Sequence, residues 1–150
     1  MRFGSIQEIL DFAVKREEEA ARAYADLQTR TTSQSLKILL AELENDEKQH
    51  KKLLLGLTGV RPSSLAIKAI PDLKISDYLV AEPPHADMSF QDLLILAAKK
   101  EQKAVDLYTE LRGLVSDAEH KKLFEFLMMQ EQSHKLKLET EYDKHVMTED

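Results

Sequence analysis

The sequence repeats itself at an offset of 84 residues, and this repeat constrains the fold more than any other feature. The shift superposes identical apolar and capping residues, among them Ser5 and Ser89, Ala13 and Ala97, Ala20 and Ala104, Tyr24 and Tyr108, Leu27 and Leu111, Leu43 and Leu127, and Leu54 and Leu138. It also superposes three ionisable pairs: Glu17 and Glu101, Glu47 and Glu131, and His50 and His134. Two copies of one helical hairpin are the simplest explanation.

Each copy contains two segments with the apolar spacing of a helix. Ser5 and Ser89, each followed by an acid three residues later, are typical N-caps. We expect helices at about residues 5–30, 34–57, 89–113 and 117–142, with a frayed tail from His145 to Asp150. The second helix is expected to turn inward Leu36, Leu39, Leu40, Leu43, Leu53, Leu54 and Leu57.

Residues 58–88 contain all four prolines and no long periodic run, so we expect a connection with at most short helical turns at 64–70 and 75–80. An antiparallel neighbour would need only about 2–8 residues. If the second and third helices run parallel, the connection must span about 33 Å, which a segment of this length can reach. The sequence therefore predicts one all-α domain over residues 1–150, a four-helix bundle with a long crossover between helices two and three.

Composition excludes several classes of function. A net charge of −6 argues against nucleic acid as a partner, because phosphate binding needs a basic surface. The absence of cysteine excludes disulfides, thiolate zinc sites and iron–sulfur clusters within this chain. No apolar run approaches the ~18 residues of a membrane span, and the first residues do not form a signal peptide. We expect a cytoplasmic protein without a membrane partner.

Six ionisable residues interrupt the apolar faces of the four helices: Glu17, Glu47, His50, Glu101, Glu131 and His134. Helix rise places the two acids of each hairpin at matched heights, about 20 Å from the turn. Buried carboxylates cost several kcal/mol unless they are paired or bind metal, and the stripes do not supply four compensating Lys or Arg residues. Two dications would neutralise four acids. One Glu from each of two helices, with Glu-x-x-His from each of the others, is the ligand scheme of di-iron and di-manganese bundles.

The alternative is structural. In that interpretation the acids form salt bridges with Lys51, Lys99 and Lys135, and the two histidines are ordinary interior residues. It does not explain why the same polar set occurs twice at one offset.

Four stretches resemble a rubrerythrin-type member of the ferritin-like superfamily: AVKREEEAARAY (13–24), LAELENDEKQHKKL (40–53), AAKKEQKAVDLY (97–108) and FLMMQEQSHKLKL (126–138). The resemblance covers all four helices and implies a ferritin-like bundle with two iron ions, or manganese or zinc, on the six residues above. The chain departs from that family in two ways. It has no cysteine for a rubredoxin-like iron domain, and Ala104 stands where rubrerythrins tend to carry an extra Glu.

Three functions stay open on the sequence. The first is an oxidoreductase that reduces peroxide or dioxygen with electrons from a separate donor. The second is a ferroxidase or iron-handling protein with Fe(II) as substrate, and the third is a structural bundle stabilised by metal. Tyr24 and Tyr108 lie two turns from Glu17 and Glu101, either as hydroxyls that support the ligands or as plain interior aromatics. The resemblance also implies a homodimer.

Overall fold

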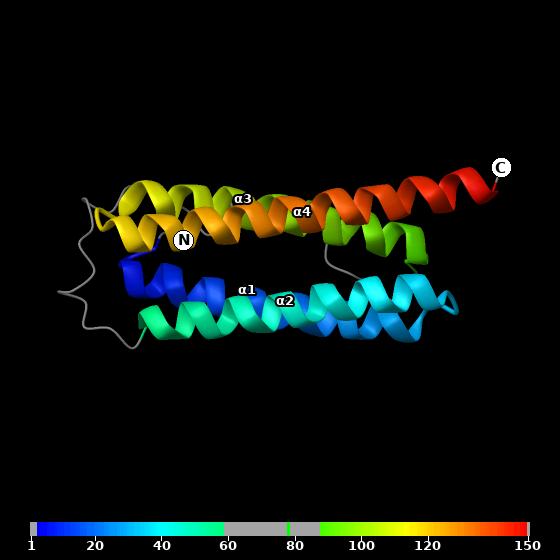
Figure 1. Cartoon of the computed structure of the whole chain (residues 1–150), viewed down its shortest axis with the longest axis horizontal. Helices are drawn as coiled ribbons and strands as arrows, with labels where there is room; N and C mark the ends of the chain where they lie inside the picture. The colour runs from blue at the N-terminus through cyan, green and yellow to red at the C-terminus, as the bar shows by residue number, and fades with distance from the viewer. Residues whose placement is uncertain (1–2, 59–77, 79–87, 150) are drawn as a thin grey trace. The chain divides into compact units, whose positions relative to one another are not determined.

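A computed structural model describes residues 3–58, 78 and 88–149. These residues form four α-helices, α1 (Ile6–Thr29), α2 (Gln34–Thr58), α3 (Phe90–Leu114) and α4 (Ala118–Glu149), coloured along the chain in Figure 1. The four predicted helices are confirmed, and each begins within one residue of its predicted start. The predicted connection at 58–88, with its short helical turns, lies almost entirely outside the described residues.

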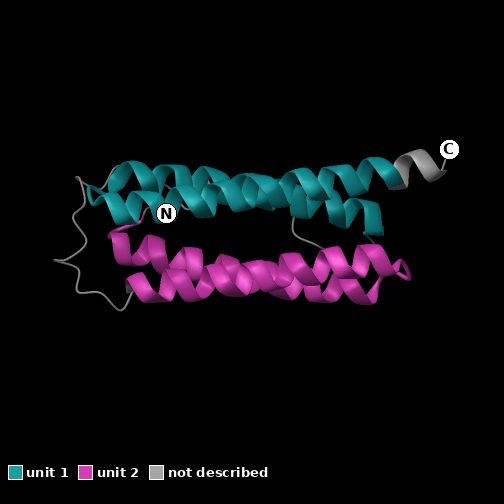
Figure 2. Ribbon diagram, in the orientation of Figure 1, with its two compact units in different colours: residues 1–2, 67–150 teal, residues 3–66 magenta. Residues whose placement is uncertain are grey.

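The chain divides into two compact units, shown in Figure 2. One unit covers Phe3–Ala66 and contains α1 packed against α2. The other covers Met1–Arg2 and Ile67–Asp150 and contains α3 packed against α4. Each copy of the sequence repeat is therefore a helical hairpin of its own, referred to below as the first and the second hairpin.

Side-chain caps begin α1 and α3, as the sequence predicts. Ser5 Oγ accepts a hydrogen bond from the Glu8 amide at 3.2 Å, and Ser89 Oγ accepts one from the Asp92 amide at 3.1 Å. The Glu8 carboxylate accepts from the amide of Gly4, the residue before the cap. These bonds satisfy amide groups that the first turn of a helix leaves without a partner.

The same device starts the other two helices. Ser33 Oγ accepts from the Leu36 amide at 3.3 Å, and Asp117 Oδ1 accepts from the Glu119 amide at 2.7 Å. Side-chain caps therefore fix the residue at which each of the four helices begins. The position of every later residue along the helix axis follows from that start.

The ends of the helices follow the sequence less closely than their starts. Backbone of α4 continues to Glu149, so the expectation of an end near Tyr142 and a frayed tail is wrong. No Gly or Pro follows Tyr142 to stop the helix. The end of α3 lies at Leu114, and Gly113 is part of the helix rather than its terminating residue.

The buried face of α2 shows the packing pattern in its simplest form. Its buried positions advance by alternating steps of four and three residues: Leu36, Leu40, Leu43, Glu47, His50, Leu54 and Leu57. Two leucines predicted to point inward lie beside this stripe, because each is one residue, about 100°, away from Leu40 or Leu54. Leu39 is half-buried, and Leu53 is 41% exposed.

The helices also differ from membrane-spanning segments in their hydropathy. Over the described ranges, none of them has a stretch long and apolar enough to cross a bilayer.

Loss of either predicted cap should destabilise its hairpin. We expect Ser5→Ala and Ser89→Ala each to lower the free energy of unfolding by about 1 kcal/mol, because a first-turn amide loses its acceptor. Urea unfolding followed by circular dichroism measures the change. Ser116→Ala, at an exposed position outside the helices, is the matched control, and an equal loss in that variant would contradict the assignment.

Candidate metal centre

The first hairpin brings three of the predicted ligands together. Glu17 comes from α1, while Glu47 and His50 come from α2, where a spacing of three residues places both on one face. All three side chains are buried. His50 Nδ1 lies 3.5 Å from Glu17 Oε2 and 3.3 Å from Glu47 Oε1. The imidazole nitrogen therefore faces one oxygen of each acid.

The second hairpin repeats this arrangement. Glu101 comes from α3, while Glu131 and His134 come from α4, and all three are buried. His134 Nδ1 lies 3.8 Å from Glu101 Oε2 and 3.4 Å from Glu131 Oε1. The sequence repeat is thus also a repeat of local geometry, down to which ring nitrogen faces the carboxylates.

A residue outside the predicted ligand set contacts the acids of the first hairpin. Arg16 Nη1 lies 2.7 Å from Glu47 Oε2 and 3.2 Å from Glu17 Oε1, and the Arg16 side chain is only 13% exposed. The expectation that the apolar helix faces do not supply enough Lys or Arg residues to compensate the acids therefore overlooked Arg16. The sequence contained a signal for this contact: a basic residue directly precedes the first acid of each copy, Arg16 before Glu17 and Lys100 before Glu101.

The charge of Arg16 lowers the pKa of the neighbouring Glu17 carboxyl group. Burial by itself would raise the pKa of Glu17, but the Arg16 charge and the contacts with His50 and Glu47 outweigh burial. The net pKa falls from 4.5 to about 2. Glu17 is therefore a carboxylate at neutral pH, the form in which it can bind a cation.

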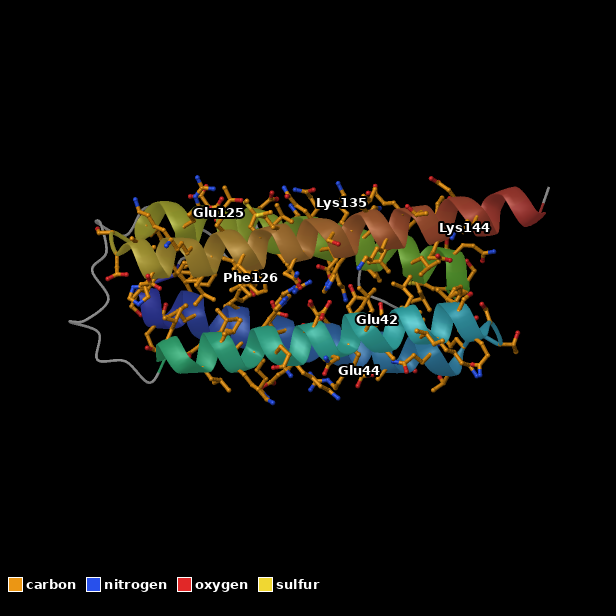
Figure 3. All side chains as sticks on the ribbon, viewed as in Figure 1. Glu42, Glu44, Glu125, Phe126, Lys135 and Lys144 are labelled. Atoms are coloured by element: carbon orange, nitrogen blue, oxygen red, sulfur yellow. The ribbon has the colours of Figure 1, made fainter. Side chains whose placement is uncertain are left out.

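Two of the three lysines proposed in the structural alternative have other partners. Lys51 Nζ pairs with Glu18 Oε1 at 3.0 Å, and Lys135, labelled in Figure 3, donates to Gln102 Oε1 at 3.0 Å. Lys99 is exposed. That alternative named the wrong cations, since Arg16 is the basic residue found on Glu17 and Glu47.

Both sets of residues fit a divalent metal by their donor chemistry and spacing. Within each hairpin, Glu, Glu and His offer one ligand atom apiece, and these atoms lie within 4.8 Å of one another. Ligand atoms about 2.0–2.2 Å from a shared ion are separated by about 2.8–3.6 Å. Three of the four nitrogen–oxygen distances, 3.3, 3.4 and 3.5 Å, already lie within that range, and the fourth, 3.8 Å, needs only a small contraction. Carboxylate with imidazole suits iron, manganese or zinc.

The two tyrosines occupy corresponding buried positions. Tyr24 in α1 and Tyr108 in α3 are at most 1% exposed. Ala104 is buried as well, whereas Ala20, its counterpart in the first hairpin, is half-buried. Burial agrees with either interpretation of the tyrosines, so support of the ligands by their hydroxyl groups stays a prediction.

Comparison with known proteins identifies relatives of this chain in both sequence and fold. The rubrerythrin family profile matches residues 8–142. A solved structure described as a hypothetical protein from Pyrococcus furiosus is similar, with a TM-score of 0.72 and 28% identity over 93% of this chain and 89% of that one. A search of curated proteins gives no match. The family match confirms the predicted all-α, ferritin-like four-helix fold, and the chain belongs to the rubrerythrin family.

Proposed function

We propose that this protein is a di-iron carboxylate oxidoreductase that reduces peroxide or dioxygen. One observation carries the proposal above the others: each hairpin buries the same Glu, Glu and His set with a ring nitrogen facing two carboxylates. Repetition of so costly an arrangement favours a shared chemical task over an accident of packing. Membership in the rubrerythrin family supports iron as the metal.

The proposed ligands have distinct tasks. Glu17, Glu47, Glu101 and Glu131 would supply the negative charge that two divalent ions require. His50 and His134 would each add a neutral nitrogen donor, which fixes the ion beside its own hairpin without further charge. Leucines on the same faces, such as Leu43 and Leu54 in α2, are fully buried and exclude water from the ligands.

Bound iron would supply a change between Fe(II) and Fe(III). Reduction of hydrogen peroxide takes two electrons and two protons, breaks the oxygen–oxygen bond and yields two molecules of water. We propose that a separate donor restores the electrons, since this chain has no cysteine to hold an iron–sulfur centre of its own.

We also propose a homodimer, which light scattering would test.

Stopped-flow spectroscopy of the Fe(II)-loaded protein tests the reaction. We expect rapid oxidation by hydrogen peroxide and repeated turnover when a reductant is present. Accumulation of many Fe(III) ions per chain under dioxygen would instead indicate iron storage. Failure of both oxidants to change the Fe(II) spectrum would contradict the proposal and favour a structural role for the metal.

The ligand assignment has its own test. We expect Glu47→Gln and Glu131→Gln each to bind fewer than two ions per chain, because an amide cannot replace an anionic ligand, while helix content is retained. Metal analysis by mass spectrometry and circular dichroism measure the two quantities. Glu125→Gln, an exposed residue of α4 labelled in Figure 3, is the matched control. Two bound ions in either ligand variant would rule out that ligand.

A further inference from the structure

The four carboxylate oxygens of Glu17 and Glu47 fall into two pairs, one that contacts Arg16 and one that faces His50. Arg16 Nη1 contacts Glu17 Oε1 and Glu47 Oε2. The other oxygen of each acid, Glu17 Oε2 and Glu47 Oε1, faces His50 Nδ1. One side of the carboxylate pair is therefore held by a permanent cation, and the side toward His50 presents the donor atoms suited to a metal.

We propose that Arg16 is the resident counter-ion of Glu17 and Glu47, stabilising the metal-free first hairpin and weakening its binding of divalent cations. This inference rests on the proposed metal centre. Arg16 is a positioning residue in it: the guanidinium acts on the metal through the two carboxylates that it contacts.

In the metal-free protein the guanidinium compensates the buried negative charge of the Glu17–Glu47 pair. Both acids are fully buried, and Arg16 is nearly so, which leaves little water to screen the charges. Arg16 belongs to α1 and Glu47 to α2, so the contact also ties the two helices of the hairpin together. Without Arg16 the metal-free hairpin should be less stable.

In the metal-bound protein the positive charge of Arg16 would instead be unfavourable. A dication on the His50 side would share Glu17 and Glu47 with a monovalent cation, and the two positive charges repel. The hydrogen bonds from Arg16 also withdraw electron density from the carboxylates. Arg16 does fix the acids in place beforehand, but that ordering is a smaller effect than the repulsion between cations.

Substitution of Arg16 should therefore have opposite effects on two properties. The metal-free protein should become less stable, while its affinity for a divalent metal should rise. We expect Arg16→Met to lower the melting temperature of the metal-free protein and to tighten binding of Co²⁺ at least tenfold. Co²⁺ binding is measured by competition with a chromophoric chelator, and melting by circular dichroism. Arg16→Gln, which keeps an amide donor but no charge, should tighten Co²⁺ binding similarly and covers the case in which the Met variant fails to fold.

Two further variants serve as controls. Arg16→Lys keeps the charge and should stay within about threefold of the wild-type affinity. Lys51→Met removes another cation that joins α2 to α1, through Glu18, without contact to a proposed ligand, and should leave Co²⁺ binding unchanged. Binding by Arg16→Met or Arg16→Gln that is equal to or weaker than wild type would overturn the role of Arg16 alone. A wild-type protein that takes up no Co²⁺, Fe²⁺ or Mn²⁺ would overturn the proposed metal centre with it.

Discussion

Charge burial is the constraint on which the rest of this structure depends. Each hairpin places two carboxylates in an apolar interior, where an ionised acid without a compensating partner costs several kcal/mol. In the first hairpin the Arg16 guanidinium contacts both Glu17 and Glu47 and supplies one compensating positive charge. A divalent ion would supply two more, so the cost of burying these acids supports the proposed metal centre, as family membership does.

Magnitudes decide whether Arg16 helps or hinders such an ion. At an effective dielectric constant of about 20, a monovalent and a divalent cation about 4–8 Å apart repel by about 4–8 kcal/mol. Fixing two glutamate side chains in advance is worth at most about 4 kcal/mol. The repulsion is the larger of the two effects, so in our proposal Arg16 favours a centre that exchanges its metal over one that holds it permanently.

The sequence predicted the four helices and the burial of the six candidate ligands because both follow from periodicity. Glu17, Glu47 and His50 lie in step with the leucines around them, and the repeat shows the pattern twice. Periodicity could not predict Arg16, because adjacent residues on a helix point about 100° apart, which places position 16 beside the buried stripe rather than on it. Its long aliphatic stem carries the guanidinium back to the acids. The prediction for Leu53 was wrong for the same geometric reason: it lies one residue, about 100°, away from Leu54 on the buried stripe and is exposed.

The position of the cation bears on how such a centre arises during folding. Small zinc domains are unfolded without metal, because their hydrophobic cores are too small to fold without the free energy of metal binding. Here Arg16 and Glu17 are consecutive in the chain, so a positive charge accompanies the first acid before any tertiary contact forms. Lys100 occupies the corresponding position before Glu101 in the second copy of the repeat. A lysine carries the same charge without the planar fork of arginine, so the two copies of the repeat have the same charge but a different donor at this position. In our proposal Arg16 compensates the acids of the first hairpin before any metal binds, so that hairpin would fold first and acquire its metal afterwards.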